Sequence, residues 1–219
     1  MKYISLNHNS APTSFKKAVI NGLAPDKGLY FPEKDVKLSK SFIESLKSLD
    51  NNEICYEVIS NYIDDEIPKN KLLEIVNDTI SFKIPLKKIE QSVYSLELFH
   101  GPTLAFKDIG AKFMASCLNY FKDSYTSKKI TVLVATSGDT GGAVAKGFSN
   151  TKDIDVCILY PKGKISEVQK KQITTNGSYV TAIEVEGDFD LCQSMVKKAF
   201  NDQEINRKVA LTSANSINV

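Results

Sequence analysis

The second part of the chain alternates short apolar runs with amphipathic stretches. The runs are apolar at consecutive positions, as in strands buried on both faces, whereas the stretches between them repeat apolar residues every three or four positions, as in helices. The predicted strands cover residues 93–98, 130–135, 154–160, 179–185 and 209–212. The predicted helices cover residues 108–122, 140–149, 165–175 and 188–201. This alternation predicts an α/β fold, in which a parallel sheet is flanked by helices on both faces.

The first part of the chain has a mostly helical pattern. Ser14 is the predicted N-cap of a helix that ends at Gly22. Further helices are predicted over residues 41–49, 53–63 and 68–80. We therefore expect a mostly helical N-terminal segment over residues 1–92, followed by an α/β domain over residues 93–219.

Charge and composition narrow the choice of partner. The net charge is only +2, from 28 basic and 26 acidic residues, so no strong electrostatic field favours nucleic acid or an acidic membrane surface. No apolar run is long enough to cross a bilayer. The four cysteines and two histidines lie far apart, so no metal site is predicted. We expect small-molecule partners and a cytoplasmic location with reduced thiols, and the oligomeric state stays open between monomer and homodimer.

Lys107 is the first candidate for chemistry. It ends the run from Glu97 to Phe106, where a short apolar strand gives way to a long amphipathic helix. A lysine taken at random is a solvated surface charge, but the residues before this one are mostly apolar and include Pro102, which bends the chain. An amine in the first turn of a helix feels the positive end of the helix dipole, which disfavours the ammonium form and favours attack on a carbonyl. The natural carbonyl partner is an aldehyde cofactor.

A small-residue turn over Ser137–Gly142 is the second candidate. It follows a predicted strand and precedes a predicted helix, so its N–H groups are placed to hold a carboxylate or phosphate. A tight strand-to-helix connection with no ligand explains the turn equally well. Its spacing matches neither a P-loop nor the GxGxxG dinucleotide pattern.

Several runs together resemble one known family. The chain is similar over its whole length to the N-terminal part of the threonine synthase family, which consists of pyridoxal phosphate enzymes with the tryptophan-synthase-beta fold. The most specific run is Leu98–Asp108, which reads LFHGPTLAFKD. The other matching runs are residues 28–32, 135–141, 158–166, 187–190 and 213–218.

The resemblance implies roles for individual residues. Lys107 would hold the aldehyde of pyridoxal 5'-phosphate as an imine (a Schiff base), with Phe106 next to the cofactor pocket. The turn would surround the substrate carboxylate and the ring-hydroxyl side of the cofactor through Ser137, Gly138, Asp139, Thr140 and Gly141. Substrate contacts would come from Ser137 and Thr140, and from two residues that hold the substrate phosphate, Asn215 and Ser216. Related folds usually carry asparagine where Asp139 stands, which leaves the role of this carboxylate open.

The implied reaction is the conversion of O-phospho-L-homoserine and water to L-threonine and phosphate, a lyase step in threonine biosynthesis. Three alternatives stay open: a serine or threonine dehydratase or another phosphate-eliminating lyase, a catalytically dead homologue that still binds ligands, and a phosphate-binding module without pyridoxal. The sequence stops after an apolar strand-like run, and the family's glycine-rich phosphate loop is expected only after Val219. We therefore expect the rest of the catalytic domain to be missing and this chain alone to have little or no activity.

Overall fold

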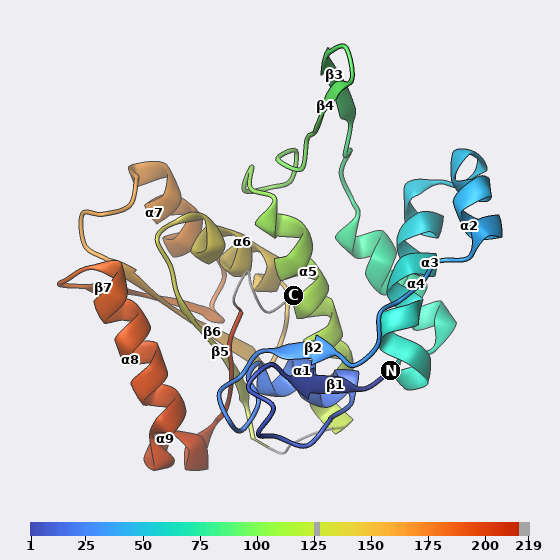
Figure 1. The fold of residues 1–219 in the computed structure, drawn as a ribbon. Coiled ribbons are helices and arrows are strands. Elements are labelled where there is room, and N and C mark those ends of the chain that lie inside the picture. The colour runs from blue at the N-terminus through green and yellow to red at the C-terminus, as the bar shows by residue number, and fades with distance from the viewer. Residues whose placement is uncertain (125–127, 215–219) are drawn as a thin grey trace. The chain divides into compact units, whose positions relative to one another are not determined.

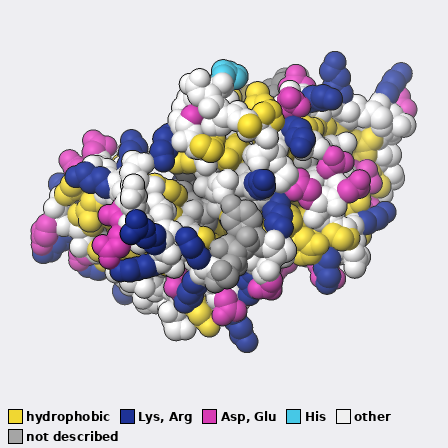
Figure 2. Space-filling view, turned by 90° about the horizontal axis from the view of Figure 1, so that it is seen from below, with side chains coloured by type: hydrophobic (Ala, Val, Ile, Leu, Met, Phe, Trp, Pro, Cys, Tyr) yellow, Lys and Arg dark blue, Asp and Glu magenta, His cyan; other side chains and the backbone are white. Residues whose placement is uncertain are grey.

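The computed structural model describes residues 1–124 and 128–214 of the chain (Figure 1). Contacts between residues divide it into two compact units, one over Met1–Ile80 and one that begins at Ser81. Within the described ranges, no helix is both long and apolar enough to span a membrane. Basic and acidic side chains are interspersed over the face drawn in Figure 2.

The first unit is built mainly of helices. Its helices are α1 (Phe15–Asn21), α2 (Lys40–Ser45), α3 (Asn51–Ile63) and α4 (Lys69–Thr79), with short 3₁₀ turns at Leu46–Ser48 and Asp64–Glu66. Ser14 caps α1 as predicted, because its side chain accepts a hydrogen bond from the Lys17 amide at 3.3 Å. The sequence missed one small sheet, in which β1 (Tyr3–Ser5) pairs antiparallel with β2 (Tyr30–Pro32). Strands of three residues carry too little periodicity to be recognised.

The second unit begins with a β-hairpin, drawn in green in Figure 1. Its strands are β3 (Leu86–Glu90) and β4 (Val93–Leu96), which pair antiparallel. The prediction that residues 93–98 form a strand of the parallel sheet was wrong, because β4 pairs only with β3 among the described strands. This pairing also places β3 in the second unit, ahead of the boundary expected after residue 92.

The centre of the second unit is a parallel sheet of four strands in the order β7-β6-β5-β8. These strands are β5 (Ile130–Ala135), β6 (Ile154–Pro161), β7 (Val180–Val185) and β8 (Ala210–Thr212). In register, Val132 of β5 lies between Val156 of β6 and Thr212 of β8. The four remaining strand predictions and the α/β class are confirmed.

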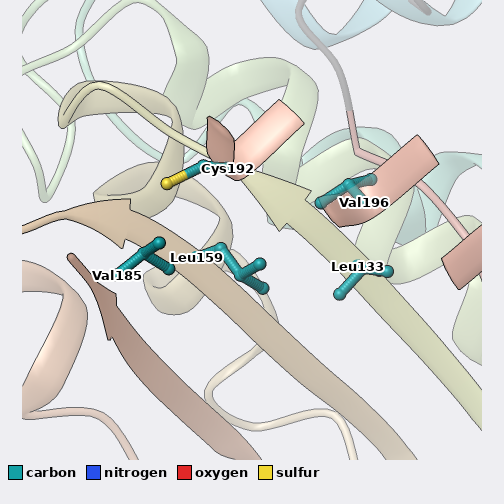
Figure 3. Packing of buried hydrophobic residues seen from close by; sticks show 5 residues of the cluster. All are labelled: Leu133, Leu159, Val185, Cys192 and Val196. Atoms are coloured by element: carbon teal, nitrogen blue, oxygen red, sulfur yellow. The ribbon is translucent and has the colours of Figure 1, made fainter. Parts of the chain in front are cut away.

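Helices cover both faces of this sheet. The chain runs from β5 through β6 to β7 and then returns past β5 to β8, so right-handed crossovers place α6 (Asp139–Phe148) and α7 (Glu167–Thr174) on one face and α8 (Phe189–Asn201) on the other. On the α8 side, the sheet and helix share a buried cluster shown in Figure 3, made of Leu133, Leu159, Val185, Cys192 and Val196. On the other side, α5 (Lys107–Phe121) packs against α6. A short helix, α9 (Gln203–Lys208), was not predicted.

Cys117, on α5, offers a test of this packing. Its side chain is fully buried, and burial raises the pKa of the thiol. Because only the thiolate reacts with iodoacetamide, we expect Cys117 in the folded protein at pH 8.5 to be alkylated at least about 100-fold more slowly than in urea. Peptide mapping after timed alkylation measures both rates. Equal rates in the two conditions would contradict the packing of α5.

Candidate active site

Lys107 is the first residue of α5, one position before the predicted start of this helix. The chain approaches it through a tight loop, in which the Leu104 amide donates to the Gly101 carbonyl at 3.1 Å and Leu104 itself has a φ of 60°. The side chain of Lys107 is 21% exposed, so its amine is partly enclosed yet still accessible to a small molecule.

Asp108 fixes this loop from the helix side. Its buried carboxylate accepts a hydrogen bond from the Thr103 amide at 2.9 Å and a second one from the Thr103 hydroxyl. The carboxylate also lies in the first turn of α5, where the helix dipole stabilises a negative charge. An added Cβ at Gly101 would come within 2.5 Å of Asp108 Oδ2, so the loop lies directly against the carboxylate. The backbone on both sides of Lys107 is therefore held in place.

The predicted turn follows β5 and opens α6. The hydroxyl of buried Thr136 accepts hydrogen bonds from the amides of Gly138 at 3.0 Å and Gly141 at 2.8 Å, which closes the turn. Gly138 has a φ of 138°, a conformation that side chains with a Cβ rarely adopt. The amides of Asp139 and Thr140 form no hydrogen bond to other described residues. They are therefore available to an anion at the start of the helix.

Close packing of α5 on α6 brings the two candidates together. An added Cβ at Gly147 on α6 would lie 3.0 Å from the backbone of Ala111 on α5, so the two helices cross with their backbones almost in contact. Lys107 Nζ consequently lies 3.8 Å from Asp139 Oδ2. The same amine lies 4.5 Å from the centre of the Phe106 ring. The amine, the aromatic ring and the turn thus surround one site.

The other predicted residues have different positions. In the turn, Ser137 is exposed and Thr140 is half-buried. The side chains of both residues form no hydrogen bond to other described residues. Asn215 and Ser216, predicted to hold the substrate phosphate, lie outside the described residues. Just before them, the Ser213 hydroxyl donates to the Leu133 carbonyl at 3.2 Å, which ties the end of β8 to β5.

Sequence reasoning missed four residues that shape the site, namely Thr103, Thr136, Gln169 and Gln172. Gln172 Nε2 donates to the Thr103 carbonyl at 3.1 Å, and Gln169 Nε2 donates to Asp139 Oδ1 at 2.9 Å. The spacing of Ser166 and Gln169 is a capping-box signal for the start of α7. That signal gives no information about the contact with Asp139, which is 30 residues away in the sequence.

Comparison with known proteins shows to which family the chain belongs. Residues 78–218 match the sequence profile described as pyridoxal-phosphate dependent enzyme. The chain belongs to this family. Residues 2–80 match a second profile, described as threonine synthase N terminus. The resemblance found in the sequence is thereby confirmed for both parts of the chain.

Individual members of the pyridoxal-phosphate dependent enzyme family are similar to this chain over its whole length. Threonine synthase of Haemophilus influenzae is 44% identical over 219 residues, which are 100% of this chain and 50% of that protein. The crystal structure of threonine synthase from Escherichia coli matches with a TM-score of 0.90 and 43% identity, covering 100% of this chain and 50% of the other. A structure of PLP-bound threonine synthase from Brucella melitensis matches with a TM-score of 0.90 and 36% identity, covering 100% and 48%. This chain therefore spans about half the length of these relatives.

The residues of the site fit the cofactor of this family. Pyridoxal phosphate offers an aldehyde, for which Lys107 supplies a partly enclosed primary amine. It is flat, and the Phe106 ring lies directly beside that amine. The cofactor and an amino-acid substrate are anionic, and the unbonded amides of Asp139 and Thr140 are donors for a negative group.

Proposed function

We propose that this chain forms the lysine-bearing half of a threonine synthase, which converts O-phospho-L-homoserine and water to L-threonine and phosphate. One observation carries the proposal: the Lys107 amine faces the α6 turn, in a chain that is 43–44% identical along its whole length to proteins named threonine synthase. We also infer a cytoplasmic location, which the absence of disulfides among the four cysteines supports.

In this proposal, Lys107 has two tasks. It would hold pyridoxal 5'-phosphate covalently through Nζ, and its amine, when not bound to the cofactor, would act as the base. When bound, the cofactor would supply an electron sink that stabilises carbanions. Lys107 would then remove a proton from one substrate carbon and return it at another. The loop held by Asp108 would keep the backbone on either side of this amine in place.

The remaining residues of the site would bind and orient. The amides of Asp139 and Thr140, with the hydroxyls of Ser137 and Thr140, would hold the substrate carboxylate at the start of α6. Gly138 and Gly141 would shape this turn, since a Cβ at either position would clash with neighbouring side chains. Phe106 would form one side of the cofactor pocket. Asn215 and Ser216 would contact the substrate phosphate, as the resemblance implies.

Borohydride reduction tests the cofactor part of this proposal. After incubation of the complete polypeptide with pyridoxal 5'-phosphate and reduction, we expect peptide mapping to find one stoichiometric pyridoxyl group, on Lys107. The matched control is Lys107→Arg, which keeps the charge at the start of α5 but cannot form the bond. A catalytically dead homologue or a phosphate-binding module would leave no pyridoxyl group on Lys107, and the proposal would then be wrong.

The second arm of the test concerns the substrate. With the complete polypeptide, we expect kcat/KM for O-phosphohomoserine to exceed that for serine or threonine by about 100-fold or more, because a site with donors for a phosphate discriminates strongly against substrates that lack one. Phosphate release and 2-oxo acid formation measure the two reactions. A preference for free serine or threonine would identify a dehydratase.

A further inference from the structure

Helix α7 carries two glutamines that contact the two segments of the site. Gln169 donates to Asp139 Oδ1 at 2.9 Å, and Gln172 donates to the Thr103 carbonyl at 3.1 Å. Thr103 belongs to the loop that holds Lys107, while Asp139 opens α6. One helix therefore contacts both the loop that carries the amine and the turn that faces it.

The chemistry of the capping box fixes which end of the Gln169 amide faces Asp139. Gln169 Oε1 accepts a hydrogen bond from the Ser166 amide at 2.9 Å. A backbone amide only donates, so the oxygen of the side chain must face Ser166 and the amino group must face Asp139. The partner of that amino group is a carboxylate oxygen, which only accepts when ionised. The contact therefore holds Asp139 by one of its two carboxylate oxygens.

The turn is shaped to admit this side chain. A Cβ at Gly138 would lie 2.3 Å from Gln169 Nε2 and 2.4 Å from its Cδ. A side chain at position 138 would thus occupy the path that Gln169 takes to Asp139. Gly138 serves two purposes here, because its φ of 138° also makes the turn possible.

Helix α7 is itself anchored. Near its end Ile173 is buried, and in its middle Lys170 forms an ion pair with Glu184 of β7 at 3.0 Å. The hydrogen bond to the Glu184 carboxylate raises the pKa of Lys170. Gln169 therefore extends from a helix that is tied to the sheet, and not from a loop.

We propose that Gln169 is a positioning residue that holds Asp139 by Oδ1 so that Oδ2 faces the Lys107 amine. The functional meaning of this contact rests on the proposed function, in which that amine carries the cofactor and moves the proton. Asp139 is more than half exposed, so without Gln169 its carboxylate is free to turn into solvent. The Lys107–Asp139 approach of 3.8 Å is then no longer fixed.

A zero-length carbodiimide cross-link tests this proposal without the cofactor. The reagent joins an amine to a carboxylate only when the two are in contact, so we expect a Lys107–Asp139 amide in the unsubstituted protein. In Gln169→Leu, which keeps the size of the side chain but has no donor, the yield should fall about fivefold or more. Gln169→Glu should also lower it, because this variant keeps the acceptor for Ser166 but sets a second carboxylate against Asp139. Peptide mapping by mass spectrometry gives the yields.

Ser166→Ala is the matched control. It removes the hydroxyl that accepts the Gln169 amide hydrogen, and so weakens the start of α7, but leaves the Gln169 side chain in contact with Asp139. We expect Ser166→Ala to lower thermal stability while keeping the cross-link yield. If Gln169→Leu keeps the full yield, or Ser166→Ala lowers it equally, Gln169 does not position Asp139. The absence of a pyridoxyl group on Lys107 of the unsubstituted protein would be a separate result. It would reject the proposed function but would not change what the cross-link yields say about Gln169.

Discussion

Replacing Lys107 by alanine in the complete protein is expected to abolish turnover of O-phosphohomoserine, with a loss of at least about 10⁴-fold in kcat. The variant loses both the group that holds the cofactor and the base that moves the proton. Folding should be unaffected, because Lys107 stands in the first turn of α5 and alanine is a good helix former. We expect the free energy of unfolding to change by less than about 1 kcal/mol. Phosphate release and denaturant titration measure the two quantities.

The control for this experiment is Lys146→Ala on the neighbouring helix α6. Lys146 is exposed, lies in the last turn of α6, and forms no contact with Lys107 among those found between described residues. This variant removes the same side chain and charge, and it should keep nearly full activity. Retained turnover in Lys107→Ala would refute the assignment of the catalytic lysine. Equal losses in both variants would show that the effect follows from charge or stability and not from chemistry.

The sequence predicted the parts of the fold that depend on local pattern. Val132 and Val134 lie in a run that is buried almost throughout, which is why β5 was recognised, and the same holds for Ile158 in β6. The end of β5 and the start of α6 were placed correctly, since the apolar run stops at a cluster of small and polar residues. Lys107 was placed beside the start of its helix because a strand-like apolar run gives way there to an amphipathic pattern.

These local patterns could not predict which distant segments of the chain pair or contact each other. Residues 93–96 have the apolar character of a sheet strand, yet Val93 and Tyr94 are exposed in a hairpin. Nothing local separates a strand of a parallel sheet from one that pairs with the preceding segment. The contact of Gln169 with Asp139 was missed because it joins two helix starts that only the packing of α7 on α6 brings together. The sequence thus pointed to candidate residues such as Lys107 and Asp139, whose chemical roles stay predictions, while the contacts that orient their side chains depend on tertiary structure.

Asp108→Ala is expected to give the largest loss of stability among substitutions near the site, about 3 kcal/mol in the free energy of unfolding. The Asp108 carboxylate is only 4% exposed and accepts two hydrogen bonds from Thr103. Removing it leaves the amide and hydroxyl of Thr103 buried without acceptors, at a cost of about 1–3 kcal/mol each. Release of the buried charge offsets part of this loss. Urea titration followed by circular dichroism measures the change.

Two further variants separate the loss of hydrogen bonds from the loss of the negative charge. Asp108→Asn keeps one acceptor oxygen for Thr103 but presents an amino group to the other donor, so its stability should fall between those of the unsubstituted protein and Asp108→Ala. Thr103→Val removes the hydroxyl bond alone, and its effect should be largely absent when Asp108 is already alanine, because the two residues form one interaction. Additive effects would contradict the pairing. If the pairing holds, the loop before Lys107 should also exchange its amide hydrogens faster in Asp108→Ala, because this carboxylate bonds the loop to the first turn of α5.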